Sequence, residues 1–172
     1  SKSISYPFGP LLRLLILTGQ RFREVSEASW NEFSLKDSKW YLPATRTKNG
    51  RANVVHLSKA IKKVLKTIPK FDEQKLIFST NGLTPVSGIS KFKKRLDHTS
   101  GVSNWRFHDL RRSFATISCD NLNIEPKVID ALLNHLTGVT TGVAAVYQRA
   151  EYTEQKKEAL EKWGAFVETL KE

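Results

Sequence analysis

The chain has 172 residues, 40% of them hydrophobic and 26% charged, which fits one globular domain and excludes a globally disordered chain. Its 28 lysines and arginines against 17 acidic residues give a formal charge of +11, which favours a polyanionic partner such as nucleic acid. The single cysteine, Cys119, excludes an internal disulfide framework and, with four scattered histidines, argues against a structural zinc site.

Apolar stretches in the chain are too short to cross a bilayer. The candidate Leu11–Leu17 is interrupted by Arg13 and falls well short of the roughly 20 residues that a spanning helix needs. The chain opens with polar residues rather than with a signal peptide. We therefore expect a cytoplasmic protein without a membrane partner, associated with the nucleoid if its charge is used on DNA. The sequence contains no methionine, so we expect a mature fragment or a domain of a longer protein.

The first third of the chain predicts two helices and then a small sheet. Pro7–Leu17 and Phe22–Ser29 are the predicted helices, and Gly19 between them stands where a helix C-terminus favours glycine. Short segments rich in aromatic and β-branched residues then predict three strands: Asn31–Leu35, Lys39–Leu42 and Asn53–Leu57. Asn49-Gly50 is typical of a hairpin, so we expect Lys48 at or near a hairpin tip.

Helical patterns return after the sheet, and the fold class is therefore mainly α with a small antiparallel β-sheet (α+β). The turn-rich stretch Phe71–Thr84 contains one short apolar segment, Leu76–Phe78. Ser58 can cap the first helix of this part and Thr153 the last. The predicted helices are Lys59–Ile68, Ser87–Leu96, Phe107–Cys119, Pro126–Leu136, Val143–Tyr147 and a final amphipathic one that extends to Leu170.

Several side chains on this frame are suited to binding a phosphate, although each alone has an ordinary structural explanation. Arg21 opens a helix after a Thr-Gly turn, where it would meet an anion or simply be solvated. Glu24, one turn on, would orient Arg21 or form a surface pair. His108 and Arg111 are three residues apart at a helix start and project from one face, where the helix dipole also favours an anion.

The remaining candidates have equally plain alternatives. Lys48 fits a soluble turn, and His108 by itself fits a helix cap or a partly buried ring. His135 ends an apolar helix, where it would interact with the helix dipole. Tyr147 ends the apolar stretch Val143–Val146 and by itself fits a core aromatic residue. The order of these residues along the chain is more informative than any of them alone.

That order resembles the tyrosine recombinases of the phage integrase family. The resemblance consists of Thr18-Gly19-Gln20-Arg21-Phe22-Arg23-Glu24, a hairpin lysine, His108-Asp109-Leu110-Arg111-Arg112, Leu133-Asn134-His135 and Tyr147, and it covers nearly the whole chain. The stretch His108–Arg112 is its most specific part. Ala145-Val146-Tyr147-Gln148-Arg149, followed by a helix with Ala159 and Trp163, is similar to integrases of prophages and genomic islands.

The resemblance implies a role for each matching residue. Arg21 and Arg111 match the two arginines that hold the scissile phosphate, and Glu24 matches the acid that supports the first of them. Lys48 matches the hairpin lysine that acts as general acid. The other matching residues are His108, paired with the second arginine as base or phosphate ligand, His135, a hydrogen-bond donor to phosphate, and Tyr147, the nucleophile.

The resemblance further implies metal-independent DNA cleavage and rejoining through a 3′-phosphotyrosine, with no cofactor. This chemistry suits two always-charged arginine forks and a phenol whose ordinary pKa, near 10, calls for a base. The implied partners are double-stranded DNA attachment sites, with four protomers on paired duplexes and a monomer as an isolated domain. Family members normally carry core-binding and arm-binding domains before the catalytic one, and we expect 1–172 to be the catalytic domain alone, binding DNA weakly.

Two details depart from the common family pattern. Asn134 stands where glycine often precedes the histidine, and the interval from His135 to Tyr147 is somewhat long. Tyr152 is therefore a competing nucleophile. The final helix would fold onto its own core or, as the resemblance suggests for some members, onto a neighbouring protomer.

Three other functions remain open from the sequence. They are a type IB topoisomerase-like enzyme that nicks and reseals, a non-catalytic basic DNA-binding module, and a degenerate relative kept for regulation. Plausible contacts to the DNA backbone, which a solvated charged face would explain almost as well, are Lys91, Lys93, Lys94, Arg95, Arg106 and Arg112.

Overall fold

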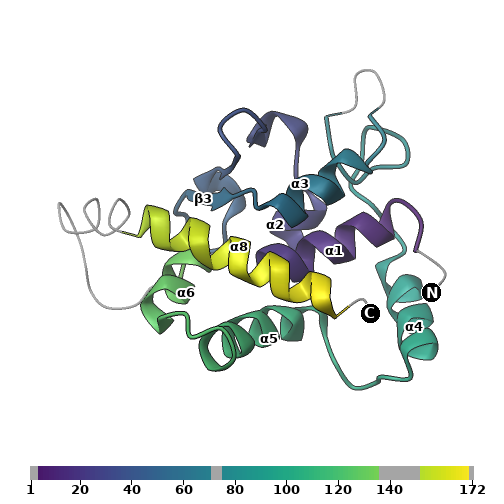
Figure 1. The fold of residues 1–172 in the computed structure, drawn as a ribbon. Helices are drawn as coiled ribbons and strands as arrows, with labels where there is room; N and C mark the ends of the chain where they lie inside the picture. Colours follow the sequence, from purple (N-terminus) through teal and green to yellow (C-terminus); the bar gives the residue numbers. More distant parts are fainter. Residues whose placement is uncertain (1–3, 71–74, 136–151, 171–172) are drawn as a thin grey trace.

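The fold is mostly helical with one small antiparallel sheet, as predicted (Figure 1). We describe it from a computed structural model, which covers residues 4–70, 75–135 and 152–170. The predicted helix Val143–Tyr147 lies outside these residues. The described elements are α1 (Phe8–Thr18), α2 (Phe22–Ser26), η1 (Trp30–Glu32), β1 (Phe33–Ser34), β2 (Lys39–Leu42), η2 (Ala44–Arg46), β3 (Asn53–His56), α3 (Lys59–Lys66), α4 (Ile89–Ser100), α5 (Phe107–Asp120), α6 (Pro126–Leu132) and α8 (Thr153–Thr169).

The core is built around α1, which contacts α3, α5 and α8. Its leucines at positions 11, 14, 15 and 17 are all buried, so this helix is apolar on most of its surface. The helix ends at Gly19, whose φ of 62° is left-handed and whose N–H donates to the Leu15 carbonyl over 3.1 Å. A Cβ at Gly19 would lie 2.7 Å from the Phe114 ring, so the close packing of α1 on α5 requires glycine here.

The sheet has the order β1-β2-β3, with both pairs antiparallel. Trp40 faces Val55 across β2 and β3, and both are buried, whereas Tyr41 between the inward positions of β2 is exposed. The ten residues from 43 to 52 connect β2 to β3 and contain η2 and Lys48. The structure confirms the predicted hairpin and the position of Lys48 between its strands, although the connection is longer than a two-residue turn.

The final helix, α8, packs on the chain's own core. It runs across the molecule over α1, with α6 near its N-terminal end (Figure 1), and it contacts α1, α3, α6 and β3. Trp163 is buried, and its ring packs edge-to-face against Phe114 with 5.1 Å between the ring centroids. Its Nε1 donates to the Ile16 carbonyl over 2.9 Å. Of the two predicted arrangements, the structure has the intramolecular one.

Several predicted boundaries are wrong, and at the second helix the reason is a long-range contact. The second helix ends at Ser26 rather than Ser29, because the chain after it pairs with the segment near Leu76, where the Ile77 N–H donates to the Ala28 carbonyl over 2.8 Å. The predicted first strand, Asn31–Leu35, is a strand only at β1 (Phe33–Ser34), and its first two residues belong to the turn η1, which directs Glu32 inward. The predicted helices Lys59–Ile68 and Pro126–Leu136 end early, at Lys66 and Leu132, and Ser87–Leu96 is shifted to Ile89–Ser100.

Two expectations about helix caps had different outcomes. Ser58 caps α3 as predicted, since its hydroxyl accepts from the Ile61 N–H over 3.5 Å. Thr153 does not cap α8, because it is the first helical residue and Tyr152 takes the cap position without a side-chain bond. Within the described part of the chain, no helix is both long and apolar enough to cross a membrane.

Candidate active site

Glu24 caps the start of α2 and holds Arg21 there. The Arg21 backbone N–H donates to Glu24 Oε2 over 2.8 Å, and its Nη1 donates to Oε1 over 2.9 Å. Glu24 is 2% exposed, whereas the Arg21 side chain is 22% exposed. The buried carboxylate therefore fixes the arginine in place while its side chain remains partly exposed to solvent, as an anion-binding group requires.

Arg111 lies buried in α5 at 4% exposure and joins two helix ends. Its Nη1 donates to the Gly19 carbonyl over 2.8 Å, at the end of α1, and its Nη2 donates to the Leu133 carbonyl after α6. Burial, together with the positive charge of Arg21, lowers the pKa of Arg111 to about 10, and Glu24 partly offsets this. The two arginines thus share one neighbourhood, and the charge of Glu24 stabilises both.

His108 lies at the exposed start of the same helix. Its pKa is lowered by partial burial and by the positive charges of Arg111, Arg112 and Arg21, against the opposing effect of Asp109. The imidazole is therefore neutral near pH 7, and a neutral ring nitrogen can accept a proton. His108 and Arg111 belong to one electrostatic cluster with Arg21.

We expect an NMR titration to give His108 a pKa below 6.5. Because the unfolded chain takes up this proton near pH 6.5 and the folded chain only at lower pH, the residue's contribution to stability decreases as pH falls through that window. The His108→Gln variant assigns the signal. A His108 midpoint at or above pH 6.5 in the folded chain would contradict the electrostatic account.

His135 follows α6 directly and is oriented by an acid. Its Nδ1 lies 2.9 Å from Asp130 Oδ1, and its backbone N–H donates to the Asp130 carbonyl over 2.9 Å. The side chain is 41% exposed. Pairing at Nδ1 directs the other ring nitrogen, Nε2, away from Asp130, so this acid orients the ring, a contact that the sequence analysis did not identify.

Lys48 is exposed in the β2–β3 connection, which approaches the turn that carries His135. The Asn49 amide donates to the Asn134 carbonyl over 2.7 Å, so residues adjacent to Lys48 and His135 are in direct contact. On its other side the connection is held by Arg46, which pairs with the buried Glu32 and donates to the Glu24 carbonyl over 2.8 Å. The lysine is thus carried on a loop that is fixed at both ends.

The two tyrosine candidates have different outcomes. Tyr147 lies outside the described residues. Tyr152 is half-buried and lines a cavity of about 200 Å³ near the beginning of α6. Asn123, Glu125 and Glu158 also line this cavity. Arg111 contacts the opposite end of that helix. Tyr152 therefore lies near the end of α6 that is opposite to the Arg111 contact.

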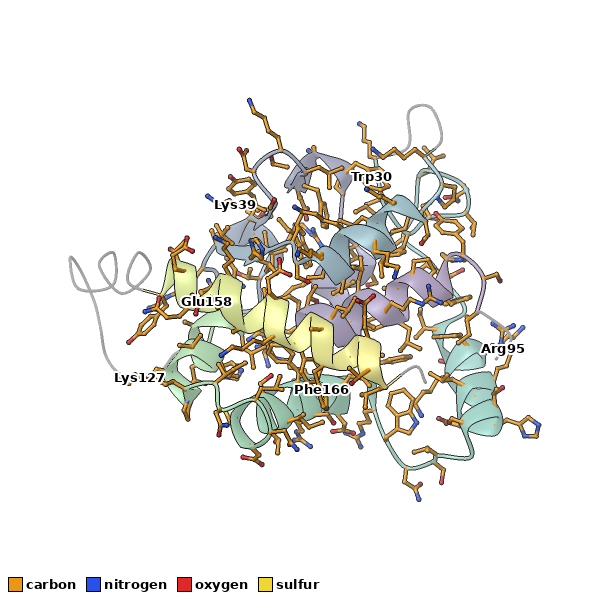
Figure 2. All side chains as sticks on the ribbon, viewed as in Figure 1. Trp30, Lys39, Arg95, Lys127, Glu158 and Phe166 are labelled. Atoms are coloured by element: carbon orange, nitrogen blue, oxygen red, sulfur yellow. The ribbon has the colours of Figure 1, made fainter. Side chains whose placement is uncertain are left out.

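Most of the basic residues suggested as DNA contacts lie on the surface. Arg95 points outward from α4 (Figure 2). Lys93 is the exception, because it pairs with both oxygens of Asp97 and lies 4.1 Å from the centre of the Trp105 ring. Arg112 is exposed but paired with Asp109 over 3.1 Å. Among the six candidates, the exposed ones are Lys91, Lys94, Arg95, Arg106 and Arg112.

A buried polar network behind the arginines was missed by the sequence analysis. Gln20 donates to the Leu132 carbonyl over 3.1 Å, and Asn53 donates to the same carbonyl over 3.2 Å. Lys156 on α8 lies 3.5 Å from Asn53 Oδ1, and burial lowers its pKa to about 8. A detectable signal was present, because strand alternation puts Asn53 on the inward face with Val55. In the described residues, no group of three or more His, Cys, Asp or Glu side chains could hold a metal ion.

Comparison with known proteins relates the chain to characterised sequences. The family model described as "Phage integrase family" matches residues 2–154 of the chain. Prophage integrase IntA of Escherichia coli (strain K12) is 27% identical over 166 residues, which is 96% of this chain and 40% of that protein. Prophage integrase IntZ of the same organism is 26% identical over 160 residues, or 92% of this chain and 39% of the relative. The chain thus spans about two fifths of the length of these curated relatives.

Solved structures show the same fold. A lambda integrase dimer bound to a COC′ core site superposes with a TM-score of 0.60 at 20% identity, over 86% of this chain and 43% of that one. XerH site-specific recombinase in a post-cleavage complex with palindromic difH substrate gives a TM-score of 0.61 at 19% identity, over 98% of this chain and 48% of that one.

Proposed function

Because the chain belongs to the phage integrase family, we propose that residues 1–172 form the catalytic domain of a tyrosine-type site-specific recombinase. Its reaction would be cleavage and rejoining of DNA strands through a 3′-phosphotyrosine, without a metal ion or cofactor. The observation that carries the proposal is that Arg21 and Arg111 share the buried Glu24, with His108 close enough to both arginines to feel their charge. The transition state of phosphoryl transfer carries more negative charge on the phosphate oxygens than the bound phosphodiester does. Two guanidinium groups can stabilise that charge, and a neutral imidazole beside them can accept a proton.

The two arginines would bind the phosphate from different positions, one buried and one partly exposed. Arg111 uses two of the five N–H donors of its guanidinium on backbone carbonyls. It therefore remains fixed while its other donors are available to a non-bridging oxygen. Arg21 is held by Glu24 and is partly exposed, so it can meet the same phosphate from solvent. Nε2 of His135 would add a further hydrogen bond.

Proton transfers follow from the remaining groups. The Tyr147 hydroxyl oxygen forms a bond to phosphorus and gives up its proton, for which the neutral His108 ring is an acceptor. The bond from phosphorus to the 5′ oxygen breaks, and the ammonium of Lys48 supplies the proton that the leaving oxygen needs. Rejoining reverses these steps with a 5′ hydroxyl from the same or another strand.

Double-stranded DNA attachment sites are the partner that we propose, with four protomers acting on two paired duplexes. The exposed basic residues on α4 and at the start of α5 would contact the DNA backbone. The isolated chain would bind DNA weakly as a monomer. A single domain contacts DNA from one side and therefore makes fewer phosphate contacts than a protein that encloses the duplex.

Covalent trapping on duplexes of random sequence tests the proposal, because such a pool does not require that the target site be identified. The chain is incubated in EDTA with short duplexes from this pool, each nicked so that cleavage releases a fragment and prevents rejoining. We expect a covalent protein–DNA product, with peptide mapping by mass spectrometry placing the nucleotide on Tyr147. Attachment to Tyr152 would reassign the nucleophile, and no adduct with any duplex would favour a non-catalytic DNA-binding module.

Trapped adducts then separate recombination from simple nicking and resealing. A labelled acceptor strand with a free 5′ hydroxyl is added to the adduct. Transfer to an acceptor on a second duplex is expected of a recombinase. Rejoining restricted to the original duplex would instead indicate a topoisomerase-like enzyme.

A further inference from the structure

The C-terminal end of α6 joins the segments that carry Arg21, Lys48 and Arg111, three of the proposed catalytic residues. A helix leaves its last carbonyl groups without partners inside the helix, and here side chains from other elements supply them. From Leu132 to Asn134, the three successive carbonyls accept from the Gln20 and Asn53 amides, the Arg111 guanidinium and the Asn49 amide. The turn before Arg21, helix α5 and the Lys48 loop therefore all meet at this helix end.

The contact to the Lys48 loop is reciprocal. Asn49 Nδ2 donates to the Asn134 carbonyl over 2.7 Å. Asn134 Nδ2 donates back to the Arg51 carbonyl over 2.8 Å and to Asn49 Oδ1 over 3.3 Å. Asn49 and Asn134 are half-buried, and the Arg51 N–H donates to Asn49 Oδ1 over 3.2 Å. Each asparagine thus holds both the other residue and the backbone of the loop.

The backbone at Asn134 does not by itself require an asparagine. Its φ of 51° is left-handed, a region that glycine enters without strain and that asparagine tolerates. Glycine would keep this turn and lose both donated bonds to the loop. The asparagine side chain therefore adds a link between the His135 turn and the Lys48 loop that the fold of the turn alone does not need.

We propose that Asn49 and Asn134 form a clamp that positions Lys48 against the scissile phosphate. This inference rests on the proposed function, and the two asparagines are positioning residues that act through Lys48. The Lys48 side chain is exposed on a long flexible stem, so the position of its ammonium depends on where the loop is held. Arg46 holds the loop toward α2, and the clamp holds it toward the arginine cluster.

The clamp should affect one proton transfer and leave phosphate binding intact. As the Tyr147 oxygen bonds to phosphorus, the bond from phosphorus to the 5′ oxygen breaks and the Lys48 ammonium proton passes to that oxygen. A 5′ sulfur in place of the oxygen leaves as a thiolate, because a thiol pKa lies near 8.5 and no proton is needed. Sulfur substitution therefore removes the dependence on Lys48.

The experiment compares Asn134→Gly with wild type on the two substrates, using a duplex recovered from the covalent trapping pool. We expect Asn134→Gly to slow adduct formation about 10-fold on the oxygen substrate, since small misplacements of a catalytic group cost this much or more, and less than about twofold on the sulfur substrate. Lys48→Ala should give the same pattern with a larger effect. The matched control is Asn123→Gly, another left-handed asparagine with φ of 50°, on the α5–α6 connection, and neither rate should change.

Hydrogen exchange supplies a readout that does not depend on catalysis. Backbone amides of residues 47–51 should exchange faster in Asn134→Gly than in wild type and at the wild-type rate in Asn123→Gly. Equal slowing on both substrates, an unchanged rate on the oxygen substrate, or unchanged exchange in the loop would each overturn the clamp. If the wild-type chain formed no adduct on either substrate, that result would contradict the proposed function itself, and the inference would fall with it.

Discussion

Arg111→Lys is expected to slow covalent adduct formation by about 10³-fold, the upper part of the range for losing one preorganised charge-stabilising donor. The buried guanidinium joins the Gly19 and Leu133 carbonyls, and a single ammonium cannot present two donors with that fork geometry. Either carbonyl left without a donor costs roughly 1–3 kcal/mol of folding free energy. The substitution therefore lowers stability and also loosens the turn that presents Arg21.

Single-turnover trapping and thermal unfolding measure the two effects separately. Arg112→Lys is the matched control, because it makes the same chemical change one residue along, on a side chain that is 74% exposed and paired only at the surface with Asp109. It should alter stability by less than about 0.5 kcal/mol. An Arg111→Lys variant that retains a tenth or more of the wild-type rate would argue against a phosphate contact by this residue.

Trp163→Ala is expected to have the largest effect on folding, with a loss of roughly 3–5 kcal/mol. The indole is 3% exposed, packs edge-on against Phe114 and donates to the Ile16 carbonyl. It thereby attaches α8 to both α1 and α5. Because about 1 kcal/mol corresponds to roughly 2–4 °C at this chain length, the melting temperature should fall by about 6–20 °C.

Trp163→Phe separates packing from hydrogen bonding at this position. It retains much of the buried area and loses the Nε1 donor, so it should cost roughly 1–3 kcal/mol, mainly from the unpaired Ile16 carbonyl. Denaturant unfolding of both variants gives the comparison. Stability of Trp163→Ala within about 1 kcal/mol of wild type would mean that α8 does not depend on this core in solution.

Periodicity and local chemistry were enough to predict the elements. The leucines of α1, the Asn-Gly hairpin signal and the Ser58 cap each act over a few residues, and the structure has all three. The ends of elements were less accessible, because long-range contacts decide them. The second helix stops at Ser26 since the chain beyond it pairs with a segment near Leu76, and no pattern within the helix itself signals that pairing.

Arg21, Lys48, His108, Arg111 and His135 were predicted as site residues from the sequence, because each lies in a short motif whose type and order are informative. What only the tertiary structure decided is how they are held. Arg111 satisfies carbonyls 92 and 22 residues away in sequence, and Asn49 meets Asn134 across 85 residues. Hydrogen bonds of that span depend on how the helices pack together rather than on local pattern. The sequence by itself determined which chemical groups are available, and helix packing determined their partners and burial, as well as the lowered pKa values of His108 and Arg111.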